Sequence, residues 1–286
     1  MNEDASCSQD PEVLRITKRF INVVNRVRSS NGIELTRDTE APEQATFVVP
    51  NLGITIVPLV YGDYHSWNLA WLDGDRSDVP YHRHFNGVEI HLGYSPIRGH
   101  IVLDNYRALT NEGYALAIPP NTRHGYVNAR AKTHHLPFIF GSYKRGGWGV
   151  FFDVEAQPIQ LKTLRKVPLD SNRLNTPIRL ESIIRNFACQ SFCKRKRILP
   201  ACRTNRNGTG GLELHLTRAP IGKPYLLRSN RFLATSVVSG SGLLRMAGQE
   251  CPIVLHDHFG IPGGIPAEIE GDEKGPLVLM DADLVP

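Results

Sequence analysis

Three histidines and one glutamate occur in an order that could bind a single metal ion. His82 and His84 are two residues apart, Glu89 follows five residues later, and His124 lies further along the chain. Residues two apart on a β-strand point to the same face of a sheet. Neutral imidazole and carboxylate groups together suit Fe, Mn, Zn, Ni or Cu. The four side chains could therefore converge inside a β-barrel on one divalent metal ion.

Turn signals surround these residues. Asn86-Gly87 is typical of a tight hairpin turn, and it separates the His82-x-His84 pair from Glu89. Pro119-Pro120-Asn121 predicts a second turn, which delivers His124 to the start of the next strand.

The first group resembles the first motif of the cupin superfamily. That motif has H-x-H, then three or four residues, then Glu, and His82, His84 and Glu89 fit it with four residues between. The leading Gly of the family motif has no counterpart at the usual distance, since Gly74 is too far upstream.

The second group resembles the second cupin motif, which has Gly, Pro, Gly, His and Asn at fixed spacing. The matching residues are Gly113, Pro119, Asn121, His124 and Asn128. Asn121 stands where the family has its middle Gly, and Asn tolerates the left-handed backbone conformation better than most residues.

The resemblance implies a cupin barrel in which His82, His84, Glu89 and His124 are the metal ligands. Four ligands leave two open positions on a six-coordinate metal, where a substrate, O2 or both can bind. The resemblance favours Fe(II), while Mn, Zn or Ni would suit the same ligands.

The second half of the sequence contains a faint repeat of this region. Aligned by their prolines, Val79-Pro80-Tyr81 corresponds to Lys223-Pro224-Tyr225. Continued without gaps, the alignment places Leu226, Arg228 and Leu233 opposite His82, His84 and Glu89. Further on, Pro262, Gly264 and Ala267 correspond to Pro119, Asn121 and His124. We therefore predict a second, degenerate cupin domain without metal. His256-x-His258 lacks a suitably spaced Glu, so we interpret this pair as structural.

The predicted fold is all-β, with two cupin barrels (double-stranded β-helix or jelly-roll) and an N-terminal helix. Residues 1–45 form a helical segment, in which Asp10-Pro11 begins the helix and Asn31-Gly32 ends it. Residues 46–158 form the metal-binding domain, 159–211 a linker with helical patches between Leu174 and Phe187, and 212–286 the second domain.

Alternating apolar residues predict the strands. They cover residues 46–49, 54–60, 65–72, 100–104, 114–118, 212–217, 232–238, 242–246 and 252–255. In HSWNLAWL, alternation places Trp67 and Leu69 on one face and Asn68 and Ala70 on the other.

Several other residues are candidates for the site. His91 shares a face with Glu89, and it could act as a general acid or base, support a ligand, or be structural. For substrate binding we consider Tyr126 and Asn128, which have the parity of His124, together with Arg98 and Trp67.

Three functions are consistent with these residues. The first is a non-haem Fe(II) dioxygenase or oxygenase for a small organic, aromatic or carboxylate-bearing substrate, because the resemblance extends to bicupin dioxygenases. The second is a Mn- or Zn-dependent isomerase, epimerase or decarboxylase of a sugar or sugar acid. The third is a small-molecule-binding cupin without catalysis. Fold by itself fixes no reaction.

Composition limits the partners. The net charge is +5, and Lys194-Arg195-Lys196-Arg197 holds part of the excess. No aromatic residues interleave with this run, so we interpret it as a solvated surface segment and expect no nucleic-acid partner. No apolar run is long enough to cross a membrane. The acidic N-terminus lacks a signal-peptide core, so we expect a cytoplasmic protein. Sheet edges favour a homodimer.

The five cysteines have no C-x2-C pair. We interpret them as reduced thiols, with a zinc site at Cys189, Cys193 and Cys202 as the alternative.

Overall fold

The structure is a computed structural model. It describes residues 36–37, 47–49, 54–62, 64–72, 78–85, 87–92, 98–110, 113–130, 135–142, 152–155, 158–175, 178–190, 194–203 and 211–285. The predicted N-terminal helix between Asp10 and Gly32 lies outside the described residues.

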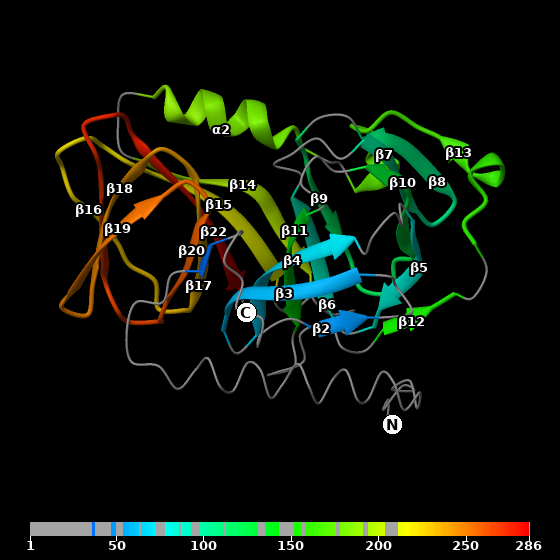
Figure 1. Cartoon of the computed structure of the whole chain (residues 1–286), viewed down its shortest axis with the longest axis horizontal. Helices are drawn as coiled ribbons and strands as arrows, with labels where there is room; N and C mark the ends of the chain where they lie inside the picture. The colour runs from blue at the N-terminus through cyan, green and yellow to red at the C-terminus, as the bar shows by residue number, and fades with distance from the viewer. Residues whose placement is uncertain are drawn as a thin grey trace.

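Two six-stranded sheets form the first barrel, which is on the right in Figure 1. Sheet 1 has the order β2 (Phe47–Val49), β3 (Ile54–Tyr61), β4 (His65–Leu72), β11 (His135–Ser142), β6 (Gly87–Leu92), β9 (Ala115–Ile118). Sheet 2 has the order β12 (Phe152–Val154), β5 (Val79–His84), β10 (His124–Arg130), β7 (Arg98–Leu103), β8 (Tyr106–Thr110), β13 (Arg165–Lys166).

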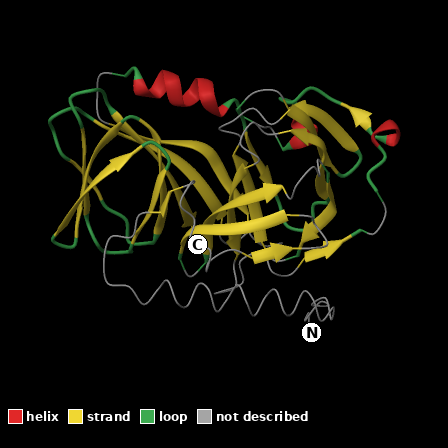
Figure 2. Ribbon diagram, viewed as in Figure 1, coloured by secondary structure: helices red, strands yellow, loops and turns green. Residues whose placement is uncertain are grey.

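A six-stranded and a four-stranded sheet form the second barrel, on the left in Figures 1 and 2. Sheet 3 has the order β1 (Thr36–Arg37), β20 (Asp257–Ile261), β17 (Leu233–Ser239), β22 (Leu277–Val285), β15 (Gly211–Ala219), β14 (Lys194–Arg203). Sheet 4 has the order β16 (Tyr225–Leu227), β21 (Ala267–Gly271), β18 (Ser241–Met246), β19 (Gln249–Val254). The predicted all-β fold is confirmed.

Alternation along the strands divides the apolar side chains among three clusters. In β4, Ala70 belongs to the interior of the first barrel, while Trp67 and Leu69 belong to a cluster between the barrels. In β22, Met280 joins that shared cluster and Leu279 faces the interior of the second barrel. The barrels therefore pack through the outer faces of sheets 1 and 3.

The helix α2 (Leu180–Ala188) covers this junction on one side (Figure 2). Its buried residues Leu180, Ile184 and Phe187 recur at helical spacing and join the shared cluster. The short 3₁₀ helices η2 (Leu161–Thr163) and η3 (Asn172–Leu174) precede it. Within the described ranges, no helix is both long and apolar enough to span a membrane.

Strand pairing joins segments across the predicted domain limits. β14 lies in the predicted linker and pairs with β15, and β1 lies in the predicted N-terminal segment and pairs with β20. The second barrel thus includes strands from outside residues 212–286. The limits of the domains stay a prediction.

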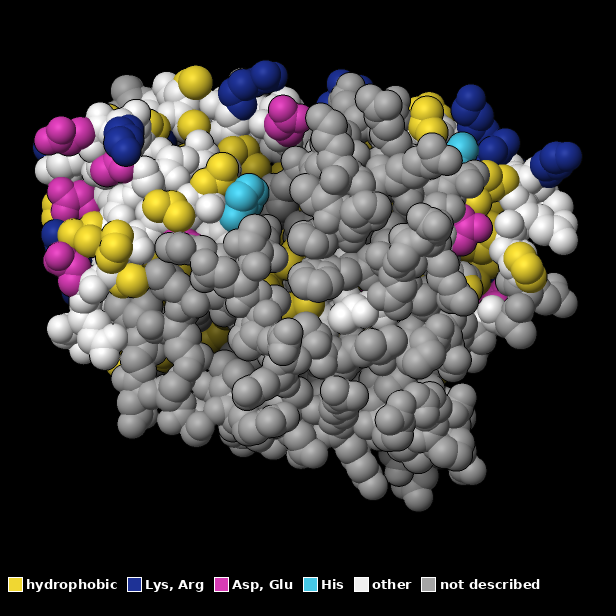
Figure 3. Space-filling model, in the orientation of Figure 1, with side chains coloured by type: hydrophobic (Ala, Val, Ile, Leu, Met, Phe, Trp, Pro, Cys, Tyr) yellow, Lys and Arg dark blue, Asp and Glu magenta, His cyan; other side chains and the backbone are white. Residues whose placement is uncertain are grey.

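The basic run Lys194 to Arg197 begins β14. Arg195 donates a hydrogen bond through Nε to the fully buried Asp281 at 3.2 Å, and Arg197 pairs with Glu213 at 2.8 Å. The prediction of a solvated segment is therefore wrong for Arg195. On the described surface of the second barrel, acidic and basic side chains interleave (Figure 3).

The predicted repeat is supported at its turn. Asn121 and Gly264 both have positive φ values, 62° and 82°. The Asn121 N–H donates to the carbonyl of His84 at 2.7 Å, and the Gly264 N–H donates to the carbonyl of Ser229 at 2.8 Å. Ser229, rather than Arg228 as the ungapped alignment has it, therefore corresponds to His84.

The first strand of the repeat requires the same correction. His82 lies opposite His124, and Leu227 lies opposite Ala267. His82 therefore corresponds to Leu227 instead of Leu226. Glu89 lies opposite the residue before Pro119, and Leu233 lies opposite the residue before Pro262, so these two correspond as the alignment predicts. The second repeat is therefore one residue shorter than the first between β16 and β17.

Cys189 is exposed and Cys251 is partly buried, and both are free thiols. Cys193 and the side chain of Cys202 lie outside what the structure describes, so the zinc alternative stays a prediction.

His65 is a buried polar contact between the barrels. Its Nε2 donates to the carbonyl of Ala282 at 3.1 Å, and its ring lies against Phe232. Burial lowers the pKa of His65 to about 4, although the charge of Asp283 opposes this shift. An unfolded histidine, with a pKa near 6.5, binds its proton first as the pH falls. Stability is therefore lost between pH 6.5 and 4, by about 3 kcal/mol in total.

We predict that His65→Gln reduces the loss of unfolding free energy between pH 7 and pH 4 by about that amount. The measurement is urea unfolding at a series of pH values, with EDTA in every sample. His256→Gln is the control, because His256 is exposed in the turn before β20. Equal pH slopes for the wild type and His65→Gln would contradict the assignment.

Candidate metal centre

Both sheets of the first barrel contribute to the candidate site. His82 and His84 lie on β5, and His124 begins the neighbouring β10 directly opposite His82. Glu89 lies on β6 in sheet 1. The hydrogen bond from Asn121 to the His84 carbonyl holds the turn before His124 against β5. The predicted turn residues thus bring the ligands of two strands together.

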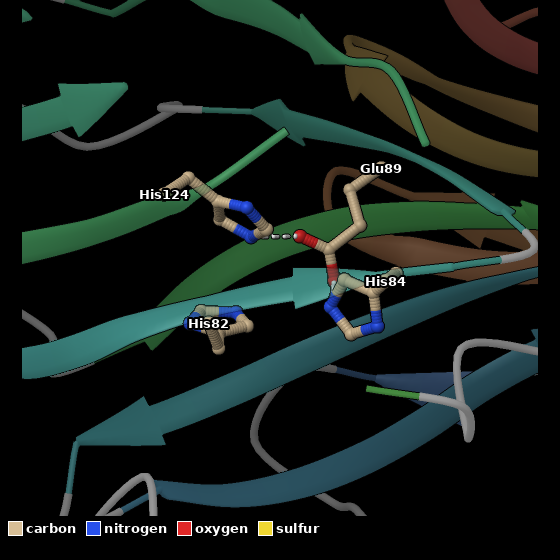
Figure 4. Close-up of side chains that lie close together, drawn as sticks. All are labelled: His82, His84, Glu89 and His124. Carbon is tan, nitrogen blue, oxygen red and sulfur yellow. Dashed lines mark hydrogen bonds and ion pairs between the residues drawn. The ribbon is translucent and has the colours of Figure 1, made fainter. Parts of the chain in front are cut away.

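The four side chains converge in the barrel interior (Figure 4). One ligand atom from each of His82, His84, Glu89 and His124 lies within 4.8 Å of the others, and all four residues are buried. Both oxygens of Glu89 face imidazoles, with Oε1 2.9 Å from Nε2 of His84 and Oε2 2.9 Å from Nε2 of His124. The group predicted from the two motifs is therefore assembled in space.

Hydrogen bonds to the backbone determine which imidazole nitrogen can bind a metal. Nδ1 of His82 lies 3.0 Å from the carbonyl of Pro80, and Nδ1 of His124 lies 2.9 Å from the carbonyl of Thr122. A carbonyl only accepts, so each Nδ1 carries the proton of the neutral ring. Nε2 of each ring then has a free lone pair directed to the interior.

Both ring nitrogens of His124 face an oxygen that can accept a hydrogen bond, but the neutral ring has only one N–H proton. Burial lowers the pKa of His124, although Glu89 opposes this, so the ring is neutral and has one N–H. With that proton on Nδ1, Nε2 and the carboxylate oxygen of Glu89 would meet lone pair to lone pair at 2.9 Å. A cation bound by both atoms removes this repulsion, so the residues fit a metal ion.

The pKa values favour the deprotonated ligand forms. Burial, followed by the charges of His124 and His84, lowers the pKa of His82 well below its usual value. Burial alone would raise the pKa of Glu89, but the adjacent imidazoles, His84 first and then His124 and His91, outweigh it and hold that pKa well below its usual range. At neutral pH His82 and Glu89 therefore need lose no proton to bind a metal.

A chain of buried hydrogen bonds runs from Glu89 into the core. Nε2 of His91 lies 2.8 Å from Oε2 of Glu89, and Nδ1 of His91 lies 2.6 Å from the hydroxyl of Tyr126. That hydroxyl is 2.9 Å from the hydroxyl of Tyr114. Burial raises the pKa of both tyrosines, so both keep their protons. A consistent assignment has Tyr114 donating to Tyr126, Tyr126 to His91, and His91 to Glu89.

Aromatic rings line the interior beside this group. Phe140 lies 5.2 Å from the ring of His84 and Phe138 lies 6.2 Å from the ring of His91, between ring centroids. Gly87 makes room for Phe140, because a Cβ at Gly87 would lie 2.1 Å from its ring. These rings and Tyr114 are absent from the sequence prediction, since their approach to the motif residues depends on strand register.

The predicted substrate-binding residues have different positions. Tyr126 lies beside His91, but Trp67 faces the junction between the barrels, where its ring is 5.7 Å from that of His258. Asn68 occupies the inward face of β4 instead. It is buried, and its Oδ1 has no hydrogen-bond partner in the described part of the chain. The prediction of Trp67 as a pocket residue is therefore wrong: Asn68 shares its face of β4 with Ala70, which lies in the interior of the first barrel.

Arg98 and Asn128 belong to β7 and β10. Their side chains lie outside what the structure describes.

Solved structures provide the comparison for this arrangement. Salicylate 1,2-dioxygenase from Pseudoaminobacter salicylatoxidans, in adducts with gentisate, matches with a TM-score of 0.63 and 13% identity, over 99% of this chain and 92% of that chain. The chain has the cupin fold. A cupin 2 conserved barrel domain protein from Leptotrichia buccalis matches this chain with a TM-score of 0.52 and 11% identity, over 91% of this chain and 93% of that chain. No protein-family model and no curated protein sequence matches it.

We predict that His82→Ala abolishes the binding of a divalent metal, because it removes one of four buried ligands. His256→Ala should leave the metal content unchanged. Elemental analysis of both purified variants beside the wild type tests this, and circular dichroism checks that each is folded. Loss of metal from His256→Ala would show that the metal binds elsewhere.

We also predict that Tyr126→Phe weakens metal binding about tenfold, because His91 loses the partner that orients it toward Glu89. Competition with a chelating dye measures the affinity. Tyr114→Phe is the matched control and should have a smaller effect, because it leaves the Tyr126–His91 contact in place. Equal affinities for Tyr126→Phe and the wild type would exclude this role.

Proposed function

We propose that the protein is a non-haem Fe(II) dioxygenase for a small hydroxylated aromatic carboxylate. One observation carries the proposal: three imidazoles and one carboxylate converge in the buried interior of a cupin barrel. The structural match to a dioxygenase named for salicylate supports this chemistry. Salicylate and gentisate, which that protein's structure names, are the first substrates to test.

His82, His84, Glu89 and His124 would hold the metal through the three Nε2 atoms and the carboxylate. When bound, iron supplies a redox centre with open positions for substrate oxygens and O2. The buried setting of these residues excludes bulk water from the reacting atoms. The low pKa values of His82 and Glu89 keep protons from competing with the metal at neutral pH.

His91 would act as a positioning residue in this proposal. Both of its nitrogens have partners, Glu89 on one side and Tyr126 on the other. A histidine occupied in this way orients the carboxylate and is a poor candidate for a mobile base. This argues against the alternative of a Mn- or Zn-dependent isomerase, epimerase or decarboxylase, in which His91 would move a proton.

The substrate would lie beside the aromatic wall of the interior. Phe138 and Phe140 offer flat apolar contacts to a ring, and Oδ1 of Asn68 would accept a hydrogen bond from a substrate hydroxyl. We keep Arg98 as the proposed partner for a carboxylate and Asn128 as a pocket residue, and we leave Trp67 out. The cytoplasmic location, the homodimer and the absence of a nucleic-acid partner stay predictions.

The test is O2 uptake by protein that is loaded anaerobically with iron and then mixed with salicylate, gentisate, catechol or a keto acid. We expect uptake with a hydroxylated aromatic carboxylate, and loss of it in His82→Ala and His124→Ala. His256→Ala is the matched control and should keep full activity. Full metal loading without O2 uptake on any of these substrates would favour a binding cupin without catalysis.

A further inference from the structure

A second group of buried polar side chains lies inside the other barrel. It consists of Arg195, His215, Thr217, Thr235 and Asp281, and we call it the Asp281 cluster. Thr235 and Asp281 are fully buried and His215 is 9% exposed. His215 and Thr235 lie directly opposite Asp281 on the two neighbouring strands, β15 and β17. The three side chains thus form one row across sheet 3.

This row faces the interior of the second barrel. Leu279 on β22, Ala219 on β15 and Val237 on β17 have the same parity as the row residues, and all three belong to the core of that barrel. The cluster therefore lies on the interior face of sheet 3.

Some polar atoms of the Asp281 cluster have hydrogen-bond partners within the protein. Oδ2 of Asp281 accepts hydrogen bonds from Oγ1 of Thr217 at 2.7 Å and from Nε of Arg195 at 3.2 Å. Nearby, Arg231 binds Asp283 through two hydrogen bonds of 2.8 and 2.9 Å, and Arg197 pairs with Glu213. Three guanidinium groups thus face three carboxylates, so the region has no net charge to neutralise.

Four buried polar atoms of the Asp281 cluster have no hydrogen-bond partner among the described residues. These atoms are Oδ1 of Asp281, Oγ1 of Thr235, Nδ1 of His215 and Nη2 of Arg195. Buried polar groups in native proteins are almost always hydrogen-bonded. Four such atoms on neighbouring residues indicate that something other than the protein completes them.

The Asp281 cluster occupies the positions that, in the first barrel, lie next to the candidate metal site. There, Phe138 lies opposite His91 and Asn68. In the second barrel, Asp281 lies opposite Thr235 and His215 in the same order of strands. The first barrel presents aromatic rings next to its metal ligands, and the second presents hydrogen-bonding groups where the metal ligands are replaced.

We propose that the Asp281 cluster is a binding site for a small, neutral, polyhydroxylated molecule. Oδ1 of Asp281 can only accept a hydrogen bond and Nη2 of Arg195 can only donate one, while the hydroxyl of Thr235 does both. A hydroxyl group donates and accepts, so adjacent hydroxyls match these atoms. The paired charges leave no excess that would select an anion or a cation. The interior of a small barrel is a common place for such a ligand.

Calorimetric titration of the full-length protein with glycerol, erythritol and D-xylose tests the proposal, with glycolate as the anionic comparison. We expect saturable binding of at least one neutral probe, one molecule per chain, and none of glycolate. Thr235→Val keeps the shape of the side chain and removes its hydroxyl, so the dissociation constant should rise about tenfold. Thr110→Val, in the first barrel, is the matched control and should not change it.

Arg195→Lys gives an independent readout, because it keeps the positive charge beside Asp281 and removes Nη2. It should weaken binding as well, whereas His82→Ala should not. Thermal unfolding and the metal content of each variant establish that it is folded. The proposal is overturned if no neutral probe binds saturably, if neither cluster variant weakens binding, or if a crystal soaked in D-xylose holds only ordered water at the cluster. None of these results bears on the proposed oxygenase activity.

Discussion

A buried carboxylate surrounded by imidazoles is the constraint on which the first barrel depends. Placing Glu89 in the interior carries a large desolvation cost, which only hydrogen bonds or positive charge can offset. His84, His91 and His124 provide the contacts, and His91 is in turn held by Tyr126. When the rings are neutral, there are too few protons for every contact to be a hydrogen bond, and a cation bound at the site would remove the repulsion that remains.

The strand arrangement follows from the need to bring these groups together. The histidines come from sheet 2 and the glutamate from sheet 1, so the site exists only when both sheets close on a common interior. The turn at Asn121 links the strand of His124 to that of His84 through one backbone hydrogen bond. A residue that tolerates a positive φ value at this turn therefore contributes to the geometry of the ligands.

The two barrels share a fold and differ in what fills them. Leu227, Ser229, Leu233 and Ala267 stand where the first barrel has its four ligand residues. Conversely, a polar residue of the second barrel, Asp281, occupies the position of the apolar Phe138 in the first barrel. Each interior thus combines an apolar part with a polar part, but the polar groups come from different strands. The outer faces of sheets 1 and 3 bury a common apolar cluster, which ties the barrels to each other.

The sequence by itself determined the all-β class, nine strands that lie near observed ones, and the candidate metal-binding group. These follow from local patterns, since a period of two defines a strand and the spacing of His82, His84 and Glu89 places them about one hairpin. Alternation within β4 also separated Asn68 and Ala70 from Trp67 and Leu69. The N-terminal helix, and the roles of Arg98 and Asn128, lie outside what the structure describes.

Only the tertiary structure decided which distant residues meet. The one-residue shift between the repeats, the approach of Tyr114 to Tyr126, and the contact of Arg195 with the buried Asp281 all depend on pairing between strands far apart in the sequence. Trp67 shows the same limit, because alternation separates the two faces of a strand without telling which face is enclosed. A run of four basic residues reads as solvated, and only the pairing of β14 with β15 brings Arg195 within hydrogen-bonding distance of the buried Asp281.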